Sequence, residues 1–236
     1  MCQNGKEISM RLDKFLVDCG VGSRTEVKKF LKNKQVTVNG QVETSPKQQI
    51  NEQVDLVAVA GDILHHEQFV YYLLNKPKGV ISATEDDHHR TVLDLLDEIA
   101  QHKEVFPVGR LDIDTHGLLL LTNNGKLAHA MLSPKKHVDK IYEVHLRESI
   151  SDENIKKLES GVIILDNYFT KEAKVNKVED KIIELTITEG KYHQVKEMLK
   201  AVGNEVVYLK RLSFGKLELG NLKKGEVIEI SLEDIE

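Results

Sequence analysis

One segment of this 236-residue chain constrains its fold more than any other, the run GRLDIDTHGLLLLT from Gly109 to Thr122. Its second half, Gly117 to Leu121, is apolar and leads into Asn123-Asn124-Gly125, which is typical of a buried strand that ends in a tight turn. The first half contains an arginine and two aspartates and cannot be buried with that strand. We therefore expect a charged loop at the mouth of a packed sheet, where reactive side chains are commonly placed.

The composition is that of an ordinary globular protein, with 40% hydrophobic and 30% charged residues. The net charge is −5, so any contact with nucleic acid must come from a local basic patch. The only cysteines, Cys2 and Cys19, exclude a disulfide framework and a cysteine-rich zinc site. No apolar run could span a membrane, and Met1 to Met10 lacks a signal-peptide core, so we expect a cytoplasmic protein. We expect a monomer, because no apolar surface stripe is evident.

The first third of the chain predicts a small α/β module. Leu12, Phe15, Leu16 and Cys19 share one face of a helix that Gly20-Val21-Gly22 ends. Ser23, three residues before Glu26, predicts a capping box at the start of a second helix. After that helix, Asn39-Gly40 is a strong signal for a two-residue hairpin turn.

Basic residues dominate this region, with seven positive and three negative side chains between residues 11 and 40. Arg24, Lys28 and Lys32 recur every four residues on one helix face, and Arg11 and Lys14 precede them. Such a face suits contact with phosphates. It is equally compatible with a solvated helix surface.

The segments Met10–Leu16, Gly22–Arg24 and Val36–Gly40 resemble the S-four domain, a module found in a small-subunit ribosomal protein, in tyrosyl-tRNA synthetases and in RNA-modifying enzymes. The resemblance covers roughly residues 10–58. It implies binding of structured RNA through shape and backbone, and it implies RNA contacts for Arg11, Lys14, Arg24, Lys28 and Lys32.

The expected organisation is a disordered extension over residues 1–9, the module over residues 10–60, a linker over residues 61–68 and a larger domain over residues 69–236. In the larger domain strands outnumber helices without regular alternation, so we predict an α+β fold with a mixed, mostly antiparallel sheet flanked by helices. The expected strands are Phe69–Leu74, Leu118–Leu121, Ile141–Leu146, Val162–Leu165, Ile182–Thr188, Val206–Leu209 and Val227–Ile230. The expected helices are Thr91–Glu98, Lys126–Leu132, Ser151–Leu158 and Gln194–Val202.

Asp112 and Asp114 are the obvious candidate pair for chemistry. Paired carboxylates divide acid and base work in glycosidases, and they also bind magnesium beside phosphate substrates. The structural alternative is that Asp112 pairs with Arg110 and that Asp114 caps the turn.

A second polar cluster, Glu189–Lys196, joins a strand to a helix, so that Tyr192, His193 and Gln194 lie near a helix N-terminus that favours anions. The alternative makes Gln194 a cap and His193 a surface residue, with Lys196 on the new helix and able to meet a carboxylate.

Two histidine pairs and one lysine-containing turn could suggest a metal or nucleotide site, but their sequence patterns do not support one. His65-His66 and His88-His89 lack the spacing of metal ligands and a third partner, so no metal site is expected. The turn Asn75–Gly79 offers Lys76 and Lys78 to phosphate, but it has no P-loop pattern.

Together these segments resemble the pseudouridine synthases, in particular the Rsu branch that acts on ribosomal RNA. The matching segments are Asn75–Val80, Gly109–Asp112 with Thr115 and Gly117-Leu118, Lys140–Tyr142 and Glu189–Lys196. Two segments, Tyr192-His193-Gln194 and Lys210–Gly215, resemble the corresponding segments of the members that modify small-subunit RNA.

The resemblance implies that Asp112 is the catalytic aspartate and that Tyr142 stacks on the isomerised uracil. Lys196 stands where the family often has an arginine that pairs with the aspartate, and lysine keeps the charge without the two-pronged bond. Arg110 would hold the flipped nucleotide or the RNA backbone, with His193 and Gln194 in support. No cofactor is implied, because the reaction is an isomerisation.

Two other functions remain open from the residues alone. One is a non-catalytic RNA-binding factor in ribosome assembly, with Asp112 structural. The other is a nucleoside or glycoside hydrolase that uses Asp112 and Asp114, which would release a free base or sugar.

Overall fold

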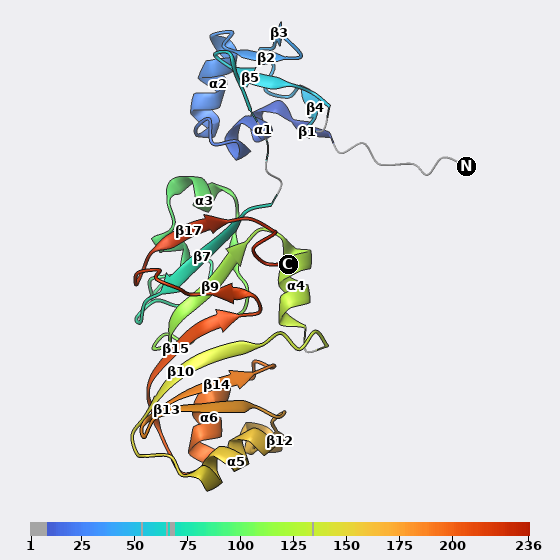
Figure 1. The fold of residues 1–236 in the computed structure, drawn as a ribbon. Coiled ribbons are helices and arrows are strands. Elements are labelled where there is room, and N and C mark those ends of the chain that lie inside the picture. The colour runs from blue at the N-terminus through green and yellow to red at the C-terminus, as the bar shows by residue number, and fades with distance from the viewer. Residues whose placement is uncertain (1–8, 53, 65, 67–68, 134) are drawn as a thin grey trace, which may run out of the picture. The chain divides into compact units, whose positions relative to one another are not determined.

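The chain forms two compact units that divide between residues 68 and 69 (Figure 1). The computed structural model describes residues 9–236 apart from residues 53, 65, 67, 68 and 134. Most of the expected N-terminal extension lies outside these described residues, and so does part of the expected linker. Ser9, expected in the extension, is instead the first residue of strand β1 (Ser9–Arg11). Among the described residues, no helix is long and apolar enough to cross a membrane.

The N-terminal unit folds as its local signals predict. Helix α1 (Leu12–Asp18) buries Leu12, Phe15 and Leu16, and it is followed by Gly20 in a left-handed conformation. Helix α2 (Arg24–Lys32) begins with the predicted capping box, in which the Ser23 side chain and the Glu26 carboxylate bond each other's backbone N–H.

Short strands complete this unit. Asn39 and Gly40 both have positive φ, the conformation of a type I′ hairpin turn. The four-stranded sheet has the order β3-β2-β5-β6, and β1 pairs separately with β4. The strands are β2 (Val36–Val38), β3 (Gln41–Val42), β4 (Gln49–Asn51), β5 (Val57–Val59) and β6 (Asp62–Ile63).

The second unit is built on a nine-stranded sheet, seven strands of which follow the order β13-β14-β10-β15-β9-β7-β17 (Figure 1). The other two are β16, which pairs with β15, and β8, which pairs with β9. Every pairing in it is antiparallel except the parallel one between β9 and β15. The predicted mixed, mostly antiparallel sheet is therefore confirmed. Its strands are β7 (Tyr71–Lys76), β8 (Phe106–Pro107), β9 (His116–Thr122), β10 (Lys140–Leu146), β13 (Lys174–Glu179), β14 (Ile182–Ile187), β15 (Val206–Phe214), β16 (Leu217–Glu218) and β17 (Val227–Ile230).

Helices pack on both faces of this sheet. Helices α3 (Glu98–His102), α5 (Asp152–Ser160) and α6 (Gln194–Ala201) contribute Ala100, Leu158 and Met198 to the larger apolar cluster on one face. Helix α4 (Gly125–Leu132) contributes Ala128 and Met131 to a smaller cluster on the other face. Successive leucines of β9 alternate between these clusters, which explains why the predicted strand is wholly apolar.

The parallel contact between β9 and β15 requires a glycine. It consists of the pairs Lys210–His116 and Arg211–Gly117. Gly117 has φ +104, and a Cβ there would lie 2.2 Å from the carbonyl oxygen of Arg211. Only glycine therefore lets the two strands approach this closely.

Several predicted elements are corrected. The expected helix Thr91–Glu98 is a 3-10 turn, Leu93–Leu95, because the Asp94 carboxylate accepts from the backbone and hydroxyl of Thr91 and Asp97 then caps α3. The strand expected over Val206–Leu209 continues to Phe214. The strand expected over Val162–Leu165 is reduced to β11 (Ile163–Ile164), followed by the 3-10 turn Leu165–Asn167 and by β12 (Tyr168–Phe169).

Candidate active site

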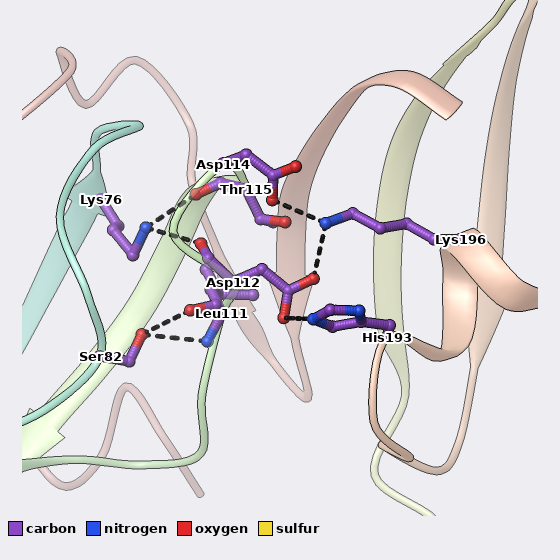
Figure 2. A network of polar contacts seen from close by, with 8 residues as sticks. All are labelled: Lys76, Ser82, Leu111, Asp112, Asp114, Thr115, His193 and Lys196. Atoms are coloured by element: carbon purple, nitrogen blue, oxygen red, sulfur yellow. Dashed lines mark hydrogen bonds and ion pairs between the residues drawn. The ribbon is translucent and has the colours of Figure 1, made fainter. Parts of the chain in front are cut away.

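A buried lysine, Lys76, holds the backbone of the charged loop that precedes β9. Lys76, at the end of β7, donates to the carbonyl oxygens of Asp112 at 3.0 Å and Thr115 at 2.9 Å (Figure 2). It also donates to the carbonyl oxygen of Pro77 at 3.2 Å. The Thr115 N–H closes the turn onto the Asp112 carbonyl at 3.0 Å. The backbone of Asp112 is thereby tied to the central sheet.

This arrangement overturns the prediction that Lys76 contacts RNA. Its side chain is fully buried, and burial lowers the pKa of its ammonium to about 8, against the opposing effect of the nearby Asp112 charge. Three carbonyl acceptors compensate the loss of water. Lys78, in contrast, is exposed in the turn that Gly79 completes, so its predicted RNA contact remains a prediction.

A serine fixes the loop from a second side, and the sequence contained no signal for it. The Ser82 hydroxyl accepts from the Leu111 N–H and donates to the Leu111 carbonyl, both at 3.0 Å (Figure 2). Both backbone groups of the residue before Asp112 are therefore satisfied by one side chain.

The Asp112 carboxylate faces helix α6. Lys196 Nζ lies 2.8 Å from Asp112 Oδ2 and 2.6 Å from Asp114 Oδ1, and His193 Nε2 lies 3.4 Å from Asp112 Oδ1 (Figure 2). The lysine thus bridges both carboxylates of the loop. The predicted meeting of Lys196 with a carboxylate is confirmed, and the sharing of the lysine with Asp114 is an addition to it.

The electrostatics of Asp114 and Lys196 favour their charged forms. Partial burial by itself raises the pKa of Asp114 and lowers that of Lys196. The hydrogen bonds of Lys196 to the two carboxylates and the attraction between the opposite charges outweigh this effect. The net result is a lowered pKa for Asp114 and a raised pKa for Lys196. Both groups are therefore charged at neutral pH.

The start of α6 is shaped by a buried glutamine. Gln194 accepts from the Lys191 N–H and donates to Glu189 at 2.8 Å, and Glu189 also accepts from the Tyr168 hydroxyl. His193, the N-cap residue, has a left-handed conformation with φ +48. Gln194 therefore shapes the loop that presents His193 to Asp112, and its own side chain is buried.

Two adjoining cavities open beside Asp112. The inner one, of about 80 Å³, is lined by the buried ring of Tyr142 together with Asp112, Lys196 and the apolar side chains of Ile187 and Leu209. The outer one, of about 510 Å³, lies against the loop of Ser82 and the residues Tyr192 and His193. Arg110, Asp112, His193 and Lys196 line both cavities.

The expected alternative pair of Asp112 with Arg110 is not what the described residues show. Arg110 is exposed, and the ion pairs given by Asp112 are to His193 and Lys196 rather than to Arg110. Nor do the described residues contain a group of three histidine, cysteine or acidic side chains placed to bind a metal ion. His89 pairs with Asp86 in its own loop.

The predicted RNA-contacting residues of the N-terminal unit lie at its surface. Arg24, Lys28 and Lys32 are exposed along α2. Arg11 and Lys14 are exposed too, but they lie 2.6 Å from Asp13 and 3.9 Å from Asp18 respectively. Their positive charge is therefore partly neutralised.

Comparison with protein families accounts for both units. Residues 10–56 match the S4 domain, the S-four module that the N-terminal segments resemble, and residues 70–201 match the RNA pseudouridylate synthase family. The chain belongs to this family of RNA-modifying isomerases.

Relatives extend over almost the whole chain. It is 52% identical to an uncharacterised RNA pseudouridine synthase of Bacillus subtilis, over 96% of this chain and 97% of that protein. It is 40% identical to the ribosomal small subunit pseudouridine synthase A of Yersinia pestis, with the same coverage, and 39% identical to the ribosomal large subunit pseudouridine synthase B of Bacillus subtilis, over 95% of this chain and 93% of that protein. A crystal structure of a pseudouridylate synthase matches 96% of this chain and 98% of its own, with a TM-score of 0.68 and 34% identity.

Proposed function

We propose that this enzyme converts one specific uridine of ribosomal RNA to pseudouridine and that Asp112 acts on the ribose of that uridine. The observation that carries the proposal is the Asp112 carboxylate beside Lys196 Nζ at 2.8 Å, on the wall of the cavity that Tyr142 lines. A charged carboxylate and an aromatic side chain in one pocket are what the isomerisation requires.

The reaction breaks the bond between ribose C1′ and N1 of uracil and forms a bond between C1′ and C5. The ring turns in the site, C5 gives up its proton and N1 gains one, so that no oxidant or energy source is consumed. Asp112 either attacks C1′ as a nucleophile or removes a sugar proton as a base. Both routes use the carboxylate in its charged form, to which Lys196 Nζ donates a hydrogen bond at 2.8 Å.

The target base must leave its stack to reach Asp112. Contact with the Tyr142 ring would compensate part of the cost of extruding it. Arg110, which is exposed and lines the inner cavity, would pair with a phosphate of the extruded nucleotide. The basic face of α2 would supply affinity for the surrounding RNA.

We propose small-subunit RNA as the substrate. The near-equal identities to a small-subunit enzyme and a large-subunit enzyme do not separate the two targets. The choice is supported by Tyr192-His193-Gln194 and by Lys210–Gly215, which resemble the small-subunit members. The proposal includes a monomer in the cytoplasm, which light scattering and cell fractionation would check.

The test is mapping of pseudouridine by carbodiimide treatment and reverse-transcription stops. Purified wild-type protein and Asp112→Ala would each be incubated with unmodified small-subunit RNA, large-subunit RNA and partly assembled subunits. A new stop in small-subunit RNA with wild type alone is expected. A stop only in large-subunit RNA would overturn the choice of substrate. Release of free uracil would instead indicate a hydrolase, and RNA binding without any stop would indicate a non-catalytic factor.

A further inference from the structure

The outer cavity, of about 510 Å³, is several times larger than the inner one, of about 80 Å³. Its volume lies within the range of about 300–1,000 Å³ that is typical of ligand pockets. It shares its wall with the inner cavity through Arg110, Asp112, His193 and Lys196. A group in the outer cavity would therefore be a direct neighbour of a base in the inner one.

A preformed aromatic surface borders this outer cavity. The rings of Tyr192 and His193 are stacked, with centroids 3.9 Å apart and planes inclined by 17°. Tyr192 is 65% exposed, which is a large exposure for an aromatic side chain outside a binding site. Since His193 is also tied to Asp112, the pair is oriented by the catalytic carboxylate itself.

The other walls suit the rest of a nucleotide. Ile81, Ala83 and Ile113 provide apolar contacts, and Ile113 is 40% exposed. The Ile113 carbonyl accepts from the Gly79 N–H at 2.7 Å, so this wall has a fixed backbone. Arg110 lines both cavities and could pair with a phosphate that joins two nucleotides.

We propose that the outer cavity is a second nucleotide subsite, in which the base next to the target uridine stacks on Tyr192 while Arg110 contacts the phosphate between the two nucleotides. Aromatic stacking accepts any base because every base has a π face. The subsite would thus hold the strand in an opened conformation rather than read its sequence. This inference rests on the proposed function, since it places the target uridine in the inner cavity.

The test is a double-mutant cycle, in which a change in the protein and a change in the RNA are made separately and together. A short RNA containing the mapped uridine would be prepared in natural form and with an abasic nucleotide directly on its 5′ or 3′ side. On natural RNA, Tyr192→Ala is expected to lower kcat/KM by about 5- to 150-fold, whereas Tyr192→Phe keeps the stack and the rate. On the RNA that is abasic at the stacked position, the kcat/KM of wild type should fall by a similar factor relative to natural RNA. The kcat/KM of Tyr192→Ala should be the same on both RNAs.

The controls separate stacking from other effects. Phe169→Ala removes an aromatic side chain that is 60% exposed outside this cavity and should leave all rates unchanged. An equal loss for Tyr192→Ala on natural RNA and on both abasic RNAs would overturn the subsite. The same combinations of protein and RNA can also be compared by their Kd values, with Asp112→Ala added to every protein so that no turnover occurs. If wild type modified no RNA, no uridine would be mapped and the proposed function would fail before this cycle is run. If wild type modified the RNA but an abasic neighbour weakened Tyr192→Ala as much as wild type, the subsite alone would fail.

Discussion

Lys196 Nζ lies between two carboxylates, 2.8 Å from Asp112 Oδ2 and 2.6 Å from Asp114 Oδ1. A guanidinium could bond one carboxylate through two parallel N–H groups, which an ammonium cannot do. The second aspartate offers another way to fix the direction of the lysine. In this chain, therefore, two carboxylates and one lysine form the unit that orients Asp112, the proposed catalytic residue.

Removing the charge of Lys196 should impair catalysis more than folding. A hydrogen bond to a charged group contributes about 1.5–3 kcal/mol, so Lys196→Met is expected to lower kcat/KM by about 10- to 150-fold. Lys196→Arg should stay within about tenfold of wild type, because it keeps the charge. Release of tritium from RNA labelled at uridine C5 measures the rate. Lys200→Met, an exposed lysine of the same helix, is the control, and full activity of Lys196→Met would contradict this role.

Replacing Lys76 should loosen the Asp112 loop. Lys76→Met removes the ammonium that donates to three carbonyl oxygens, and we expect this to lower the free energy of unfolding at pH 7 by on the order of 2 kcal/mol. A small displacement of a catalytic group is costly, so the rate should fall by about 10- to 100-fold. Urea unfolding and the tritium assay would measure the two effects, and an unchanged rate would contradict the anchoring role.

The same residue predicts a pH dependence. Its pKa of about 8 in the folded protein is below the ordinary value of about 10.4, so the unfolded chain binds more protons between these two values. The free energy of unfolding should therefore rise as pH increases from about 8 to 10.4, by up to about 3 kcal/mol. Lys140, whose pKa is also about 8, contributes in the same direction. The difference between wild type and Lys76→Met isolates Lys76, and a difference independent of pH would contradict the assignment.

Gly117 should tolerate no side chain. In Gly117→Ala the new Cβ would lie 2.2 Å from the oxygen and 2.7 Å from the nitrogen of Arg211, at a φ of +104. We expect a loss of about 3 kcal/mol or more in unfolding free energy, from strain and from a widened strand contact. Gly125→Ala is the control, since a Cβ added there would meet no atom within 4 Å beyond its chain neighbours and its own helix backbone. Thermal unfolding of the two variants should differ clearly.

Neutralising the exposed face of α2 should weaken RNA binding without affecting the fold. Arg24→Ala, Lys28→Ala and Lys32→Ala together are expected to reduce affinity and to lower the slope of log K against log salt by about 2 to 3. Filter binding at several salt concentrations measures that slope. An equal triple change at the exposed lysines Lys126, Lys156 and Lys200 is the control. Identical slopes for both triple variants would refute the contact.

Local signals predicted local structure well. The Ser23–Glu26 capping box and the Asn39-Gly40 turn were confirmed because their geometry depends on residues only a few positions apart. The helix expected over Thr91–Glu98 was wrong for a related reason. The spacing of its apolar residues fits a helix. Instead, the Asp94 carboxylate accepts from the Thr91 N–H and the Asp97 carboxylate accepts from the Ala100 N–H, so the segment ends one turn and begins another helix.

The site depended on contacts that no local pattern encodes. Asp112 and Lys196 are 84 positions apart, and they were connected through resemblance rather than through spacing. Lys76 was taken for a surface cation because lysine in a turn usually is one. Only the packed strand reveals that its ammonium points inward. The edge strand β13 was missed because its side chains are mostly exposed and give little alternation.

Asp112 is attached to two separate parts of the unit, by its carbonyl to Lys76 at the end of β7 and by its carboxylate to Lys196 on α6. A designer who wished to graft this catalytic centre onto another scaffold could not move the GRLDID segment alone. The smallest transferable part would comprise four stretches, residues 75–82, 109–117, 140–142 and 189–196. Tyr142 lines the same pocket, and the position of a functional group is only as accurate as its supporting residues.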